Sequence, residues 1–126
     1  MDTKKLKIRV VLLIFFILFF NLIAMSFHWY YLLWWLDMPM HFLGGLWLTL
    51  AVILFIYPRK NVSDFVPRVI LVSLLVFIFW EIFQIIVKNE IGGDLFDLKD
   101  TLSDICFDLA GGFTAIFYFF KRIKLN

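Results

Sequence analysis

The chain is poor in the residues on which most catalytic and redox motifs depend. It has one cysteine, two histidines, three prolines and six glycines among 126 residues. A lone cysteine, Cys106, excludes an intrachain disulfide. There is no glycine-rich phosphate loop, no Ser or Cys nucleophile motif and no His-Glu-x-x-His zinc signature. These absences argue against the enzyme classes that such motifs mark.

Charge is also scarce, and apolar residues take its place. Charged residues make up 17% of the chain, and the formal net charge of +2 is too small to indicate a nucleic-acid partner. Hydrophobic residues make up 63%, with a mean hydropathy of +0.94, whereas soluble domains use roughly 45–50% apolar residues. We therefore predict a single all-helical membrane domain over residues 1–126.

Four stretches are long and apolar enough to cross a bilayer core of about 30 Å, which takes about 20 helical residues. They cover residues 8–26, 38–57, 66–87 and 102–120. The last is the least apolar because it contains Asp104 and Asp108. A cleavable signal peptide at the start is disfavoured, since Ala24-Met-Ser26 is a poor cleavage site. The fold class predicted is an all-α polytopic membrane protein with four transmembrane helices.

Basic residues gather on one side of these predicted spans. Of the twelve Lys and Arg, ten lie with the two termini and the second loop, and only Lys88 and Lys99 lie on the other side. The positive-inside rule then predicts a cytoplasmic (inner) membrane protein with both termini cytoplasmic. The segment His28–Trp35, rich in Trp and Tyr, becomes an outer interfacial loop that anchors the chain at headgroup depth.

Polar side chains from three predicted helices reach similar depth in the outer half. At about 1.5 Å per residue, His41 lies one turn down the second helix, while Glu81 and Asp108 lie roughly 10 Å deep. Asp104 lies one turn above Asp108. A carboxylate at mid-membrane costs roughly 2.5–3.5 kcal/mol, and such residues usually face a bundle interior or a cavity. We predict these four side chains as the catalytic or metal-ligating residues.

Further polar side chains surround the outer opening of this group. The predicted pocket mouth consists of Asp37, Gln84, Asp97 and Asp100. Helix capping alone would account for Asp37, Asp100 and Asp104, because each lies near the predicted start of a helix. Capping does not account for Asp108 or Glu81, which lie too deep.

One pattern occurs twice, 67 residues apart. It reads Asp37-x3-His41-x2-Gly44-Gly45 in the second predicted span and Asp104-x3-Asp108-x2-Gly111-Gly112 in the fourth. Both spans run from outside to inside, so the pattern suggests a parallel two-helix pseudo-repeat. Small residues let helix backbones approach closely. The glycine pairs therefore predict that these two helices pack together just below the polar residues.

Three kinds of chemistry fit the polar group. Carboxylates with one imidazole can bind a divalent cation. A site made mainly of carboxylate oxygens suits Mg, Ca or Mn, and the imidazole ligand extends the choice to Zn or Fe. Without a metal, crowded carboxylates can share a proton and one can act as a general acid. A proton or cation relay is the third.

A relay across the membrane needs polar side chains that continue toward the cytoplasmic half. Below the level of Asp108, the second predicted span has only Thr49 and the fourth has only Thr114, which favours a pocket over a conduit.

Three blocks of the sequence resemble the VanZ-like family of small membrane proteins. They are Met-Pro-Met-His41-Phe-Leu-Gly-Gly, Trp80-Glu-Ile-Phe-Gln84, and the Asp-rich block from Asp97 to Gly112. Members of that family commonly carry Asn where this chain has Asp108, so the site here is more acidic. They also commonly carry a basic residue near the Asp-rich block, a position that Lys99 can fill.

The resemblance implies a site that opens toward the outer face, because the founding member is associated with low-level resistance to teicoplanin, a lipoglycopeptide that acts there. The leading hypothesis is a protein that acts on or binds an envelope lipid or lipid-like ligand. If it is an enzyme, metal-assisted hydrolysis or transfer is the expected class. One alternative is a component of a proton or cation pathway that is completed by homo-oligomerisation. The other is a structural partner subunit whose acidic residues pair with a basic helix of another membrane protein.

Overall fold

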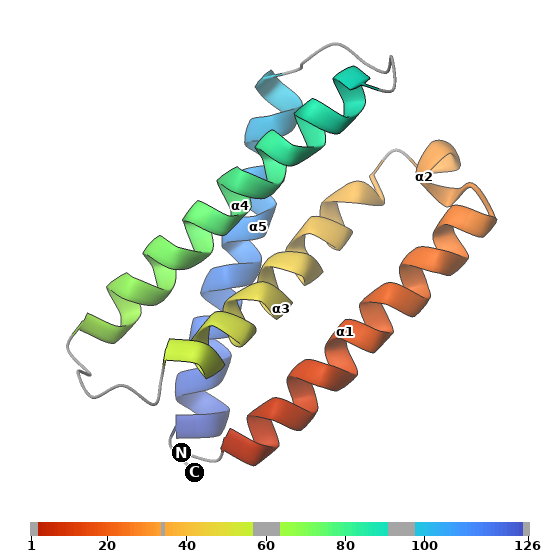
Figure 1. The fold of residues 1–126 in the computed structure, drawn as a ribbon. Helices are drawn as coiled ribbons and strands as arrows, with labels where there is room; N and C mark the ends of the chain where they lie inside the picture. The colour runs from red at the N-terminus through yellow and green to blue at the C-terminus, as the bar shows by residue number, and fades with distance from the viewer. Residues whose placement is uncertain (1–2, 34, 57–63, 91–97, 125–126) are drawn as a thin grey trace.

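Four long helices pack side by side in the computed structural model, which describes residues 3–33, 35–56, 64–90 and 98–124 (Figure 1). The elements are α1 (Thr3–Ser26), the short α2 (Trp29–Leu32), α3 (Asp37–Ile56), α4 (Phe65–Glu90), α5 (Leu98–Tyr118) and a π-helical turn (Phe119–Lys124). All four long helices are long and apolar enough to cross a membrane. The prediction of an all-α fold with four membrane spans is confirmed.

Several helices extend beyond the predicted spans. α1 begins at Thr3 rather than at residue 8, α4 ends at Glu90 rather than at 87, and α5 begins at Leu98 rather than at 102. The added residues are mostly charged or polar. A prediction based on hydropathy therefore stops before them, although the helical backbone continues through them. The predicted loop after α1 contains α2, and His28 separates the two helices with a left-handed φ of 56°.

α3 and α5 run parallel to each other, and α1 and α4 run in the opposite direction (Figure 1). The start of α1 and the π-helical turn lie at one end of the bundle, which we call the terminal end. We call the opposite end, where α2 joins α1 to α3, the α2 end. The most extensive helix pair is α3 with α5, as the repeated glycine pattern predicts.

Two glycines allow this close approach of α3 and α5. A Cβ placed on Gly45 would lie 2.1 Å from the backbone oxygen of Asp108, and one on Gly111 would lie 2.1 Å from the backbone oxygen of Phe42. Any side chain at either position would force the two helices apart. A Cβ on Gly44, in contrast, meets nothing within 4 Å, so the two glycine pairs do not have matching roles.

The apolar core lies toward the terminal end. Its buried members come from all four long helices and the π-helical turn: Leu6, Val10, Leu50, Ile53, Phe65, Val69, Ala115 and Phe119. Arg9 of α1 also contacts α5 there. It donates a hydrogen bond to the hydroxyl of Tyr118, and its guanidinium carbon lies 5.7 Å from the centre of the Tyr118 ring. The interior of the bundle near the α2 end therefore holds polar side chains instead of this apolar core.

Candidate functional site

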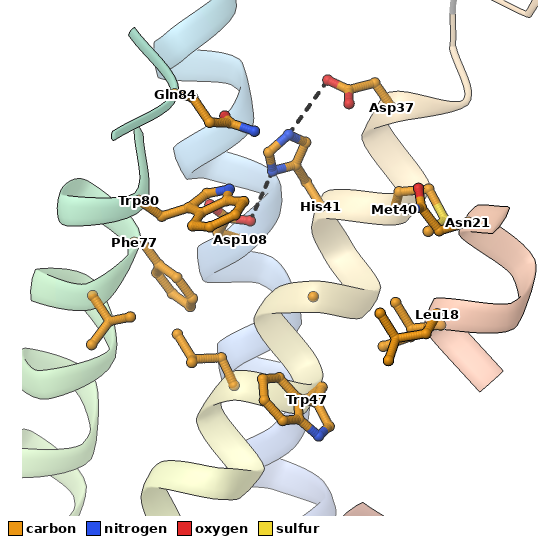
Figure 2. A pocket seen from close by; sticks show the side chains of 14 residues that line it. Leu18, Asn21, Asp37, Met40, His41, Trp47, Phe77, Trp80, Gln84 and Asp108 are labelled. Atoms are coloured by element: carbon orange, nitrogen blue, oxygen red, sulfur yellow. Dashed lines mark hydrogen bonds and ion pairs between the residues drawn. The ribbon is translucent and has the colours of Figure 1, made fainter. Parts of the chain in front are cut away.

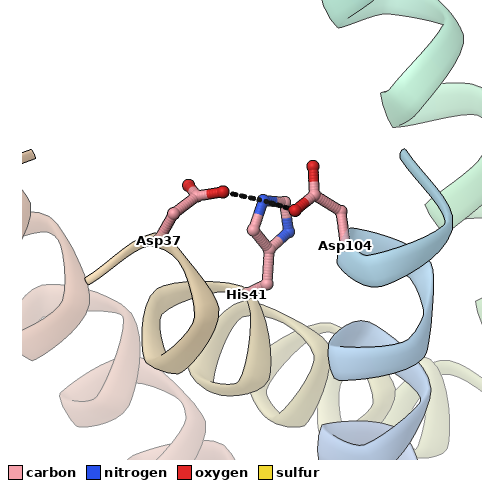
Figure 3. A group of neighbouring side chains, drawn as sticks. All are labelled: Asp37, His41 and Asp104. Carbon is pink, nitrogen blue, oxygen red and sulfur yellow. Dashed lines mark ion pairs between the residues drawn. The ribbon is translucent and has the colours of Figure 1, made fainter. Parts of the chain in front are cut away.

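His41 lies one turn into α3 and has carboxylates at both ring nitrogens. Its Nδ1 is 3.1 Å from Oδ1 of Asp108 on α5. Its Nε2 is 3.4 Å from Oδ1 of Asp104 and 3.4 Å from Oδ2 of Asp37. Figure 3 shows Asp37 and Asp104 on either side of the imidazole. Because Asp37 precedes His41 by four residues on the same helix, the two side chains share one face of α3.

α4 contributes a fourth carboxylate from the other side. Glu81 offers an oxygen that, with ligand atoms of His41 and Asp108, forms a group whose members lie within 4.8 Å of one another. We call the whole set the acid–histidine cluster: Asp37, His41, Glu81, Asp104 and Asp108. Glu81, Asp104 and Asp108 are only 4%, 7% and 5% exposed. Burying a carboxylate is unfavourable unless it is neutralised, paired or coordinated, so this set is unlike a solvated acidic surface.

The structure thus brings together the four side chains that the sequence predicts as a site, and their role stays a prediction. The residues predicted at the pocket mouth lie in different places. Asp37 contacts His41, and Gln84 lines a neighbouring cavity. Asp100 is exposed in the first turn of α5. Asp97 lies outside the described residues.

The interpretation of Asp104 as a helix-capping residue is wrong. α5 begins at Leu98, so Asp104 lies in the second turn, beyond the free backbone N–H groups that a capping side chain satisfies. Its side chain is buried and reaches Nε2 of His41 instead. The error follows from placing the start of the helix four residues too late.

A cavity of about 380 Å³ adjoins the cluster between α1, α3 and α4 (Figure 2). Its polar lining consists of Asn21, Asp37, His41, Gln84 and Asp108. Apolar and aromatic side chains line the rest: Ile17, Leu18, Met40, Trp47, Leu48, Val76, Phe77 and Trp80. The cavity therefore has an acidic region beside apolar walls, which suits a ligand with one polar and one apolar part.

The cluster contains two overlapping groups with the spacing of a metal site. One consists of Asp37, His41 and Asp104, and the other of His41, Glu81 and Asp108. They share His41, whose Nε2 faces Asp37 and Asp104 and whose Nδ1 faces Asp108. A metal-ligating histidine usually donates its other N–H to a carboxylate, which fixes the orientation of the ring. The geometry therefore allows one ion on one side of His41 and an orienting carboxylate on the other.

Two side chains with buried polar atoms in and near this region were not predicted as functional. Ser73 is 2% exposed on α4, and Trp47 of α3 lines the cavity with a buried Nε1. Ser73 lies eight residues before Glu81, which places it about two turns away on the same face of α4. That spacing is a usable signal in the sequence. Nothing in the sequence distinguishes Trp47 from the other tryptophans.

One comparison with known proteins assigns the chain to a family. A family model described as "Predicted membrane protein (DUF2238)" matches residues 3–124, so the chain belongs to this family. Searches of curated proteins and of solved structures found no match. The family match supports a membrane protein and does not address the VanZ-like resemblance, which stays a prediction from the sequence.

Proposed function

We propose that this membrane protein binds a divalent metal cation at the acid–histidine cluster and holds the polar part of a lipid or lipid-like ligand beside it. The observation that carries the proposal is one histidine with carboxylates at both ring nitrogens, next to a cavity with apolar walls. Carboxylate oxygens suit Mg²⁺, Ca²⁺ and Mn²⁺, and the imidazole extends this choice to Zn²⁺ and Fe²⁺.

The more buried group is the better candidate for the ion itself. His41, Glu81 and Asp108 come from three different helices, and both of these acids are buried. Nδ1 of His41 would then be the ligand atom, which leaves the Nε2 hydrogen to be shared between Asp37 and Asp104. This arrangement gives every member of the cluster a defined part in holding the ion.

The neighbouring cavity supports an amphipathic ligand. A volume of about 380 Å³ falls within the range of known small-molecule pockets. The acidic cluster by itself repels an anionic headgroup, whereas a bound divalent cation attracts its oxygens. From the positive-inside rule we expect this α2 end at the outer leaflet of the cytoplasmic membrane. An envelope lipid is therefore the ligand class that we propose, with metal-assisted hydrolysis or transfer as the reaction class.

Filling the cavity tests the lipid part of the proposal. Gly44 lines the cavity, and a Cβ there meets nothing within 4 Å. We expect Gly44→Phe to occupy the space without moving a helix and to displace co-purifying lipid, while bound metal remains. Lipid mass spectrometry and metal analysis of the same detergent-purified sample measure both quantities.

Gly44→Ala is the matched control, because a methyl group leaves most of the cavity open. It should retain both lipid and metal. If Gly44→Phe carries as much lipid as Gly44→Ala, the cavity is not the lipid site and that part of the proposal fails.

A further inference from the structure

The lining of the cavity beside the acid–histidine cluster changes from polar to apolar along the bundle axis. On each of the three helices that form its walls, the lining residue nearest the α2 end is polar: Asn21 on α1, Asp37 on α3 and Gln84 on α4. Figure 2 shows this order, with Asp37 and Gln84 at one end of the cavity and Leu18 and Trp47 at the other. The cavity therefore has a polar end and an apolar end.

The length of the cavity matches one leaflet of a bilayer. It extends along α3 from Asp37 to Leu48, which is about 16 Å at about 1.5 Å per residue. The hydrocarbon core of a bilayer is about 30 Å thick. Because we expect the α2 end at the outer surface, the apolar end of the cavity then lies near the middle of the membrane. A lipid of the outer leaflet has the same order, with its headgroup outward and its acyl chain inward.

The cavity opens sideways between α1 and α4. These two helices lie on either side of α3 (Figure 1), and within the described part of the chain they do not pack extensively against each other. Leu18 on α1 and Val76 and Trp80 on α4 line the cavity, although they are 51%, 39% and 51% exposed. These side chains therefore also form part of the outer surface of the bundle, which faces lipid when the protein is in a membrane.

We propose that one acyl chain of an outer-leaflet lipid enters this cavity sideways, between α1 and α4, and lies along α3 with its headgroup at the acid–histidine cluster and its end near Trp47 and Leu48. The inference rests on the proposed lipid ligand and adds the route and the orientation of that lipid. Such a ligand does not cross water, because its chain moves from one apolar environment to another while its headgroup keeps its depth. The ligand class is thereby narrowed to lipids that reside in the outer leaflet.

A covalent bridge between α1 and α4 tests the route. In a Cys106→Ser background, which removes the only native thiol, Leu18→Cys and Val76→Cys are combined. The folded protein is treated with bis-methanethiosulfonate reagents of increasing length, and intact mass identifies the bridged form. The protein is then reconstituted into vesicles of isotope-labelled total lipid extract from the expression host, and the lipid bound after repurification is analysed by mass spectrometry. We expect exchange without the bridge, loss of exchange with it, and recovery when the bridge is reduced.

The two single cysteine variants are the matched controls. Treated with the same reagents, each carries an adduct without a bridge and should still exchange its lipid. A bridged double variant that exchanges as fast as the untreated protein overturns the sideways route, although its bound lipid still supports the proposed function. Wild-type protein that carries no lipid overturns the lipid part of the proposed function and this inference with it.

Photo-crosslinking tests the orientation. Cells that express the protein are fed a fatty acid with a diazirine at its methyl end, so that lipids carry the probe whatever their headgroup. Illumination should label Trp47 rather than Met40 and Gln84, and Gly44→Phe should remove the label from Trp47. Phe15, which is 65% exposed at similar depth on α1, should stay labelled in both proteins. Labelling mainly of Met40 and Gln84, or a Trp47 label that Gly44→Phe leaves unchanged, overturns the orientation.

Discussion

Gly45→Ala should strongly destabilise the α3–α5 pair and disturb the acid–histidine cluster with it. The new methyl carbon would lie 2.1 Å from the backbone oxygen of Asp108, and a backbone atom cannot rotate away as a side chain can. Overpacking of this kind typically costs about 1–3 kcal/mol and occasionally more. Separation of the helices also moves Asp108 away from Nδ1 of His41. The midpoint of denaturant-induced unfolding in mild detergent measures the effect.

Gly44→Ala provides a closely matched control. It makes the same chemical change one residue earlier in α3, where a Cβ meets nothing within 4 Å. We expect its unfolding midpoint to stay near that of the wild type. Equal midpoints for the two variants would contradict the close α3–α5 contact. Gly111→Ala should behave like Gly45→Ala, because it meets the backbone oxygen of Phe42 at the same distance of 2.1 Å.

We expect the purified wild-type protein to bind one divalent cation per chain, and His41→Ala and Asp108→Asn to lose it. His41→Ala removes the ring nitrogen, and Asp108→Asn removes the negative charge of the carboxylate, that we propose as ligands of the ion. Asp104→Asn alters only the orienting contact to Nε2, so the affinity should fall by about 10–100-fold rather than vanish. Metal analysis after purification without chelator, repeated after incubation with Mn²⁺, Zn²⁺ and Mg²⁺, measures this binding.

Asp64→Asn is the control for a general loss of negative charge. Asp64 is exposed, is far from the cluster in sequence and pairs with Arg68 at 3.9 Å, so its variant should keep the metal. Wild-type protein that carries no divalent metal after purification, and takes up none of the three added ions, would refute the metal site. Metal that survives in both His41→Ala and Asp108→Asn would place the ion elsewhere.

Much of the architecture could be predicted from the sequence, for identifiable physical reasons. Membrane crossing depends on length and on hydropathy summed along a segment, and neither quantity needs knowledge of neighbouring helices. The constant rise of a helix placed Glu81 and Asp108 at matching depth. The recurrence of small residues in two spans indicated which helices approach each other. Helix ends were less accurate, because hydropathy falls before the hydrogen-bonded backbone stops.

The acid–histidine cluster was predictable as a group and not as a geometry. Depth along a helix says that His41, Glu81 and Asp108 occur at one level, whereas the rotation of each helix about its axis decides whether they meet. The sequence likewise left Asp104 open to interpretation as a capping residue. The structure shows it buried against Nε2 of His41.

The sequence by itself determined that this protein is an all-helical membrane protein with four spans and acidic residues at a shared depth. Only the tertiary structure decided that Gly45, and not Gly44, faces a neighbouring backbone, and that Asp104 lies buried against Nε2 of His41. The reason is that α1, α3 and α4 are apolar on nearly every face, so hydrophobic periodicity does not fix their rotation. That rotation is set by the packing of side chains from the other helices, which no single segment of the sequence contains.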